Sequence, residues 1–255
     1  MTGRLARFGM IGGRSMRKES LTMKLDHIVY FTNDEINEVV NEQHAKGNCA
    51  AAGGRHENWG TANALLYTDN AYIEWLTVEE EGKARAAAAD QPLIAQYFHD
   101  RQYGDGWATV CFSVPDIEQW KEELDNKGFT TTDVLPAARR TADGKVLRWK
   151  MLFIEQSVSV ELPYPFFIEW EESEAERMER LEKNGARTAV HRQRRISECV
   201  FHVEDPLRET GEWAVLLSQK AGDDHDIRIG DVVFRFIEKQ AAAQRLAEIH
   251  FSSNG

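Results

Sequence analysis

The sequence predicts an α+β fold in which tandem βαβββ modules pair into a curled mixed sheet, followed by a partial third module. Three observations predict it. The runs "LDHIVYFTND" at 25–34 and "WATVCFSVPD" at 107–116 are both rich in β-branched and aromatic residues, and both end on an aspartate at a turn. Each run is followed by apolar residues at helical spacing. Each unit then ends on nearly the same strand, "YIEW" at 72–75 and "FIEW" at 167–170.

Each unit begins with one strand and one helix. The helices are predicted over 35–47 and 117–128, and both stop at a glycine that suits a left-handed C-cap, Gly47 and Gly128. About three strands follow each helix, and the third is less distinct than the others. The clearest matching segments are "TANALLY" at 61–67 and "RWKMLFI" at 148–154.

A fainter copy of the unit follows. It contains "ISECVFHVED", a helix-like segment, "DIRIGDVVFRFIE" and "AEIHFSS", while the polar segment "EESEAERMERLEKNG" separates it from the second copy. The predicted divisions are 1–22 as a disordered basic tail, 23–90 as the first module, 91–172 as the second, 173–195 as a polar helical linker and 196–255 as the partial third module.

The charge of the chain argues against a nucleic-acid partner. The 255 residues have an ordinary globular composition, 42% hydrophobic and 29% charged, and a formal net charge of −11. Residues 1–22 carry five basic side chains and one acid, so the acidic excess lies in the rest of the chain. Such a surface repels phosphate backbones, and the short basic run at 191–195 is better read as part of a solvated, charge-laced surface.

The sequence also predicts a cytoplasmic protein. No apolar run approaches the roughly 18 to 20 residues that a membrane span needs, and the N-terminus has no secretory h-region. The three cysteines, Cys49, Cys111 and Cys199, share no CxxC spacing and are expected to be reduced thiols. We expect a small-molecule partner, neither nucleic acid nor membrane, and a monomer or homodimer.

The repeated acid at the end of each unit is the strongest functional signal. Strand alternation puts Glu74 on the same face as Tyr72 and Leu76, and Glu169 occupies the same place in "FIEW". Burying a carboxylate without a partner costs several kcal/mol, so two buried acids require a metal ion or an arginine. Outward-facing acids are a third alternative. The arginines near these strands in the sequence are Arg55, Arg139, Arg140 and Arg148.

Two further segments carry residues typical of a binding site. The segment "GGRHENWGT" at 53–61, expected as a loop, places charge, an imidazole and an indole close together, and the second unit carries "ARRTADGKVLRW" at 138–149 with a predicted hairpin turn at 143–144. Surface salt bridges and one tucked tryptophan would explain the same residues. The candidate substrate-binding residues are Arg55, Asn58, Trp59, Thr61, Asn63, Thr109, Arg139, Arg148 and Trp149, and we expect Trp59 and Trp149 to line the mouth of a cup.

Three of these stretches resemble the glyoxalase-like domain family, within the vicinal oxygen chelate (glyoxalase/bleomycin resistance/dioxygenase) superfamily. They are "GGRHENWGTANALLYTDNAYIEWL" at 53–76, "ARRTADGKVLRWKMLF" at 138–153 and "PFFIEW" at 165–170. The resemblance covers residues 24–170 well and the remainder weakly. It implies the vicinal oxygen chelate fold, in which two modules form one central cup.

The resemblance also implies a metal site. In the superfamily the ligands come from the first and last strands of each module, which here carry His27 and Thr109 on the first strands and Glu74 and Glu169 on the last. Threonine is a poor ligand, so His27, Glu74 and Glu169 remain as candidates for a divalent ion such as Mn, Fe, Ni, Zn or Mg.

The function that the resemblance implies is a glyoxalase-like small-molecule enzyme of the lyase, isomerase or dioxygenase type. A metal would polarise vicinal oxygens, and Glu74, Glu169 or His56 would move a proton. The alternative is a non-catalytic binding or resistance-type protein with the same cup. The sequence contains no Walker, Rossmann, HExxH or GxSxG pattern, so nucleotide hydrolysis and serine-type acyl transfer have no support.

Overall fold

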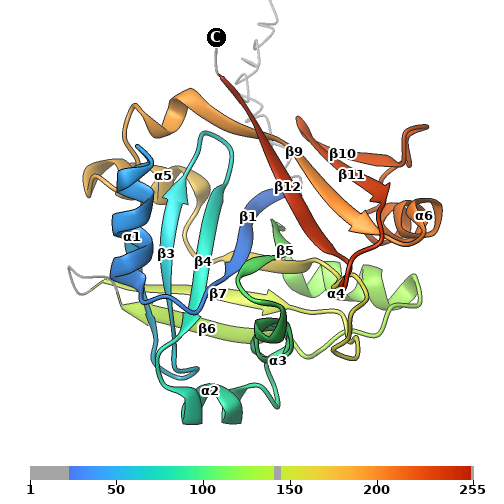
Figure 1. Cartoon of the computed structure of the whole chain (residues 1–255), viewed down its shortest axis with the longest axis horizontal. Coiled ribbons are helices and arrows are strands. Elements are labelled where there is room, and N and C mark those ends of the chain that lie inside the picture. The colour runs from blue at the N-terminus through green and yellow to red at the C-terminus, as the bar shows by residue number, and fades with distance from the viewer. Residues whose placement is uncertain (1–22, 141–144, 254–255) are drawn as a thin grey trace, which may run out of the picture.

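The computed structural model describes residues 23–140 and 145–253, and the strands of these ranges form two sheets (Figure 1). One sheet has eight strands in the order β2-β3-β4-β1-β5-β8-β7-β6, and the other has four in the order β10-β11-β9-β12. The predicted tail at 1–22 and the predicted turn at 143–144 lie outside the described residues.

The first βαβββ unit forms one half of the large sheet. Its elements are β1 (Lys24–Phe31), α1 (Ile36–Ala45), β2 (Ala51–His56), β3 (Thr61–Tyr67) and β4 (Tyr72–Val78). Two helices that the sequence analysis did not predict, α2 (Glu81–Ala87) and α3 (Pro92–Asp100), then lead to the second unit through a short 3₁₀ turn, η1 (Arg101–Tyr103).

The second unit repeats this order in the other half. It consists of β5 (Gly106–Ser113), α4 (Ile117–Asn126), β6 (Leu135–Arg140), β7 (Val146–Leu152) and β8 (Phe166–Trp170). In both units the last strand pairs in parallel with the first, β4 with β1 and β8 with β5, while β1 and β5 join the halves as an antiparallel pair. The sheet is mixed and curls into a cup, as predicted.

The rest of the chain adds a helix and the second sheet. The elements are α5 (Glu174–Lys183), η2 (His191–Gln193), β9 (Arg194–Val203), α6 (Pro206–Leu216), β10 (Asp226–Ile229), β11 (Val232–Glu238) and β12 (Arg245–Ser253). Strand β11 runs parallel to β9, the same relation as β4 to β1, so β9, α6, β10 and β11 form the partial third module of the predicted fold. The residue boundaries proposed between the modules stay predictions.

The third module packs on the outside of the cup. One core cluster joins Phe112 and Phe167 of the large sheet to Phe201, Phe234 and other residues of the small one. In Figure 1 the orange and red strands accordingly lie to one side of the large sheet. The inner face of the cup therefore stays available for a site.

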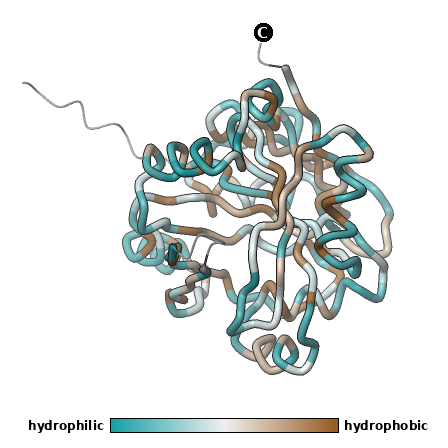
Figure 2. The backbone as a smooth tube through the Cα atoms, turned by 90° about the vertical axis from the view of Figure 1, so that its left-hand side faces the viewer, coloured by the Kyte–Doolittle hydropathy of each residue, from teal (hydrophilic) through white to brown (hydrophobic). Residues whose placement is uncertain are grey.

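Two helices cover different parts of the first unit. Helix α1 packs Val39 against the outer face of β3 and β4, next to Ala64 and Ile73. Helix α5 packs Leu181 against Tyr67 and its neighbours at the inner face. The tube in Figure 2 is brown along the central strands and mostly teal on the peripheral helices, which is the pattern expected for amphipathic helices over an apolar sheet. No helix within the described ranges is long and apolar enough to span a membrane.

The segment at 53–61 is largely not a loop. Strand β2 continues to His56, a tight turn follows, and β3 begins at Thr61, so the segment forms a β-hairpin. Gly60 closes the turn with φ of +64°, and a Cβ there would lie 2.7 Å from the carbonyl oxygen of Glu80. The hairpin thus needs glycine at position 60.

Candidate functional site

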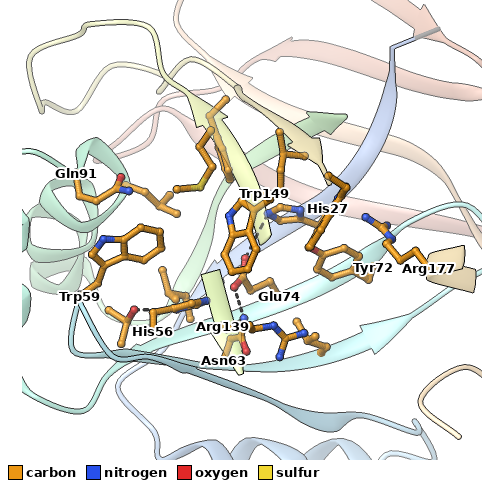
Figure 3. A pocket seen from close by; sticks show the side chains of 18 of the residues that line it. His27, His56, Trp59, Asn63, Tyr72, Glu74, Gln91, Arg139, Trp149 and Arg177 are labelled. Atoms are coloured by element: carbon orange, nitrogen blue, oxygen red, sulfur yellow. Dashed lines mark hydrogen bonds and ion pairs between the residues drawn. The ribbon is translucent and has the colours of Figure 1, made fainter. Parts of the chain in front are cut away.

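A cavity of about 60 Å³ lies on the inner face of the cup, with β3 and β4 of the first unit on one side and β7 and β8 of the second on the other. Helix α5 contributes Arg177, labelled in Figure 3, and Arg180 to its wall. Room of this size holds a few water molecules or the reacting end of a small ligand. The wall is mainly aromatic and aliphatic, and a few buried polar groups interrupt it.

The alternation of strand β4 explains why an acid lies in this wall. Tyr72, Glu74 and Leu76 face the cavity, whereas Ile73 and Trp75 face helix α1 in the outer core. Glu74 is 7% exposed. The orientation predicted for Glu74 from the sequence is therefore confirmed.

Glu74 ends a chain of buried ionisable groups that begins on β1. The Nδ1 atom of His27 lies 2.9 Å from Oδ1 of Asp26, and its Nε2 atom lies 3.3 Å from Oε2 of Glu74. Asp26 and His27 are adjacent in β1, and both side chains belong to this chain of groups because the pairing of β1 with β5 is irregular here. Leu25 pairs with Phe112 and His27 pairs with Cys111, so Asp26 has no partner residue on β5. Such bulges re-aim side chains.

The geometry of this chain requires a cation or a proton between His27 and Glu74. A neutral imidazole that donates Nδ1–H to Asp26 has a lone pair on Nε2, and an ionised Glu74 also offers only lone pairs. Two lone pairs 3.3 Å apart repel each other. We infer that His27 and Glu74 share one proton, which leaves His27 hydrogen-bonded on both sides.

The carboxylate of Asp26 balances the positive charge of this proton from the Nδ1 side of the His27 ring. Burial alone would raise the pKa of Asp26, but the Arg177 guanidinium and hydrogen bonds from His27 and Trp170 outweigh burial and hold the pKa well below its usual range. Arg177 Nη1 and Trp170 Nε1 lie 2.9 Å and 3.0 Å from Oδ2 of Asp26. Asp26 is thus ionised and fixes the orientation of the imidazole.

Asn63 holds the other oxygen of Glu74. Its Nδ2 donates to Oε1 of Glu74 over 2.5 Å, so Glu74 is the acceptor and the amide orientation follows. The Oδ1 atom of Asn63 lies over Gly53, where a Cβ would approach it to 2.2 Å. Gly53 therefore provides the room that lets Asn63 reach Glu74.

His56 is a buried, neutral imidazole in the same wall. Its Nδ1 atom lies 3.0 Å from Oγ1 of Thr61, and its ring centroid lies 5.3 Å from that of Trp59 and 6.2 Å from that of Trp149. Burial, with Arg139 nearby, lowers the pKa of His56 to about 4 against the opposing effect of Glu74. At neutral pH the ring is uncharged.

This pKa predicts a pH-dependent stability. An unfolded histidine has a pKa of about 6.5, so between pH 6.5 and pH 4 the unfolded chain binds a proton that folded His56 excludes. Stability should fall by about 3 kcal/mol as the pH drops through this window, and His56→Gln should lack that loss. Urea unfolding of both proteins at a series of pH values measures it. Parallel pH profiles would contradict the assignment.

A second cavity, of about 480 Å³, adjoins the first. His56, Trp59 and Trp149 line both cavities and so form the wall between them. Asn58, Arg148 and Glu169 face only the outer cavity. The two tryptophans expected at the mouth of the cup therefore lie between the inner cavity and the outer one.

The structure corrects the expectation that Glu169 joins His27 and Glu74. On β8 it is Phe166, Ile168 and Trp170 that line the inner cavity. Glu169 points the other way, where its Oε2 accepts the backbone N–H of Ile117 over 2.8 Å at the start of helix α4. Its second oxygen lies 3.7 Å from Nζ of Lys150.

The physical reason is a difference of register between the two halves. Val29 of β1 pairs with Glu74, and Cys111, the equivalent of Val29 in the sequence repeat, pairs with Phe166. The structural counterpart of Glu74 is thus Phe166, three residues before Glu169. Because strand side chains alternate, an odd shift moves the acid to the opposite face.

Two other predicted site residues also lie elsewhere. Thr109 donates to the carbonyl oxygen of Tyr164 and lines a separate groove. Arg55 forms an exposed ion pair with Glu79, with Nε 2.6 Å from Oε2. The inner cavity does collect eight of the predicted residues: His27, His56, Trp59, Thr61, Asn63, Glu74, Arg139 and Trp149.

The donor set does not fit the predicted metal site. Of the three predicted ligands, only His27 and Glu74 converge, while Phe166 fills the position from which the second unit would supply a carboxylate. Within the described ranges no group of three or more His, Cys, Asp or Glu side chains could hold a metal ion. Two protein ligands fall short of the three that catalytic zinc sites use.

Several residues of the cavity were missed by the sequence analysis. Asp26 stands beside His27 and could have been found from that adjacency, and Gln91 precedes a proline that begins helix α3. Arg177 and Arg180 come from the polar segment read as a linker, and nothing in its charge pattern distinguishes them from its other charged residues. Arg180 pairs with Glu172.

Comparison with known families gives the same grouping. The family model described as a glyoxalase-like domain matches residues 25–217, which is most of the chain. The chain belongs to the glyoxalase-like domain family. Its place in the vicinal oxygen chelate superfamily agrees with the resemblance found in the sequence. No curated protein matches the chain significantly.

One solved structure shares the fold of this glyoxalase-like protein over most of both chains, and others resemble part of it. A hypothetical protein from Staphylococcus aureus is 22% identical, with 91% of each chain covered and a TM-score of 0.77. Methylmalonyl-CoA epimerase from Mycobacterium tuberculosis is 19% identical over 66% of this chain and 99% of that one, with a TM-score of 0.43. A hypothetical protein from Bacillus halodurans is 19% identical over 60% and 96%, with a TM-score of 0.40. The last two scores reflect partial likeness only.

Proposed function

We propose that this chain is a small-molecule enzyme that moves a proton at a carbon next to a carbonyl group, as isomerases and lyases do. The observation that carries the proposal is the buried Asp26–His27–Glu74 chain, which ends at a mainly apolar cavity. A carboxylate that contacts an imidazole ring beside a mainly apolar cavity suits general acid–base chemistry.

Glu74 is the group that we propose accepts the proton. Its oxygens reach the cavity wall, Asn63 fixes one of them, and protonated His27 balances the charge of the other. The C–H bond of the substrate breaks as its proton passes to Glu74, and the electron pair moves onto the carbonyl as an enolate. Glu74 then returns the proton to the same carbon, and the carbonyl group forms again. Asp26 positions His27 throughout.

Arg139 is the group that we propose stabilises the enolate oxygen. It lines the cavity beside Asn63 (Figure 3), and within the described parts of the chain no carboxylate pairs with it. A guanidinium that lies beside developing negative charge in a mainly apolar site contributes strongly to catalysis. Neutral His56 completes the polar side of the cavity without adding charge.

The cavities bear on the substrate, and the cysteines bear on the cellular compartment. The inner cavity admits only a small reacting group, while Trp59 and Trp149 offer flat walls to it. We therefore propose a small planar carbonyl compound that enters from the outer cavity. A cytoplasmic location and a monomeric or homodimeric state belong to the same proposal, and the three cysteines, which form no disulfide, suit a reducing compartment.

The alternative is a binding protein that uses the same cup without catalysis. It is favoured by one observation, that Thr109 and Phe166 of the second unit replace the ligand positions of the superfamily. A dioxygenase activity would need a metal, which the described donor set does not fit.

Deuterium exchange tests the proposal. Hydroxyacetone and methoxyacetone both carry protons next to a ketone, and proton NMR in D₂O follows their loss. We expect the protein to accelerate exchange of at least one of these probes well above the buffer rate. Binding without any acceleration would favour the non-catalytic alternative instead.

A further inference from the structure

Two buried amide oxygens, each on a residue that lines the inner cavity, lack a hydrogen-bond partner. They are Oδ1 of Asn63 and Oε1 of Gln91, and each of the two residues is only 5% exposed. Six such side-chain atoms occur among the described residues, and only these two belong to residues of this cavity. Buried acceptors without a partner destabilise a fold, so most proteins keep few of them.

Gln91 has no evident structural task for its side chain. It occupies the N-cap position of helix α3, but its side chain makes no capping hydrogen bond. Its backbone carbonyl, in contrast, accepts from the N–H groups of Ile94 and Ala95. In Figure 3 the Gln91 amide extends along the cavity beside Trp59. Glutamine is a poor N-cap, and serine or aspartate would serve the helix better.

The two polar atoms of the Asn63 side chain differ in their hydrogen bonding. The Nδ2 atom donates a hydrogen bond to Glu74, and no donor reaches the Oδ1 atom. Reversing the amide would place its oxygen against the carboxylate, so the orientation is fixed by charge. The unpartnered oxygen therefore belongs to the arrangement that holds Glu74.

We infer that the substrate carries a hydroxyl group next to its carbonyl, and that Oε1 of Gln91 accepts the hydrogen bond that this hydroxyl donates. This inference rests on the proposed function of the same cavity. The cavity offers donors as well, from Arg139 and the neutral ring of His56. A hydroxyl both donates and accepts, so it matches such a mixed surface. An α-hydroxy carbonyl compound is the resulting substrate class.

The unpartnered oxygen of Gln91 also gives selectivity. A ligand without a donor leaves Oε1 of Gln91 buried and unsatisfied, whereas a ligand hydroxyl group satisfies it. Sites built in this way reject analogues that lack the donor. Gln91 is therefore a specificity-determining residue. Its unpartnered oxygen lowers the stability of the free protein and serves ligand binding.

The first test compares two buried glutamines in and just before helix α3. Gln96 is 9% exposed and donates its Nε2 to Oδ1 of Asp100 over 2.7 Å, so it has a partner where Gln91 has none. Gln91→Met should raise the melting temperature by a few degrees, because it removes an unsatisfied acceptor at nearly constant volume. Gln96→Met should lower it. A lower melting temperature for Gln91→Met would overturn the inference.

The second test measures binding with the two probes named above. Hydroxyacetone and methoxyacetone differ only in the hydroxyl hydrogen, which a methyl group replaces. Ligand-observed NMR titration should show wild-type protein preferring hydroxyacetone by about tenfold, the effect expected of one hydrogen bond. Gln91→Met should bind the two equally, and Gln96→Met should keep the preference. Equal binding by wild type, or a preference that survives in Gln91→Met, contradicts the inference.

These outcomes separate the inference from the proposed function. Binding with the predicted preference but without deuterium exchange would refute catalysis and leave the role of Gln91 standing. Exchange of both probes at equal affinity would refute the role of Gln91 and leave catalysis standing.

Discussion

Glu74→Gln is expected to slow deuterium exchange by about 10²- to 10⁴-fold, the usual contribution of a positioned general acid or base. The amide has nearly the shape of the carboxylate but cannot accept the proton. Asn63 and His27 would keep hydrogen-bonding partners in the variant, so the fold should remain intact. Exchange rates for hydroxyacetone, followed by proton NMR, measure the loss.

The matched control is Glu169→Gln. The same change on β8 removes a carboxylate that faces away from the inner cavity and accepts the Ile117 N–H. This variant should exchange hydroxyacetone at close to the wild-type rate. Equal losses in the two variants would mean that the register difference between β4 and β8 does not separate their roles.

Arg177→Met is expected to destabilise the protein by about 3–5 kcal/mol, because it leaves the Asp26 carboxylate buried and without its cation. Asp26 and Arg177 have side chains that are 2% and 12% exposed, and they lie 2.9 Å apart. Methionine keeps most of the aliphatic part of the arginine side chain, next to the Trp170 ring. Chemical unfolding at pH 7 measures the change.

Arg55→Met is the control for this change. Arg55 also pairs with a carboxylate, but its side chain is 74% exposed, so its loss should cost about 1 kcal/mol or less. Adding Asp26→Asn to Arg177→Met should recover part of the stability, since the unpaired charge is then removed. Similar costs for the two arginine variants, or no recovery in the double variant, would contradict a buried ion pair.

The sequence predicted most of the fold because the repeat is carried by local patterns. Alternation placed Glu74 inward, and terminal glycines marked the ends of α1 and α4, where Gly47 and Gly128 have φ of +79° and +90°. Strand β2 was hidden because "AAGGRH" has neither alternation nor β-branched residues. Patterns within one element suffice for such predictions.

The site was only partly predictable because its parts meet through register and tertiary packing. Two acids in nearly identical strings face opposite ways, and only the pairing of Cys111 with Phe166 reveals it. Arg177 reaches Asp26 from a helix 151 residues away in the chain. The register of strands and the docking of a polar helix are long-range properties that a local string does not encode.

The central claim is that an acid–base pair from the first unit, His27 and Glu74, acts without a metal shared by the two units. The most direct test is hydroxyacetone exchange by protein that has been treated with a chelator and dialysed, with and without added Mn²⁺. The account predicts full exchange in the metal-free protein and no gain from Mn²⁺. Exchange that disappears on chelation and returns with the metal would contradict it.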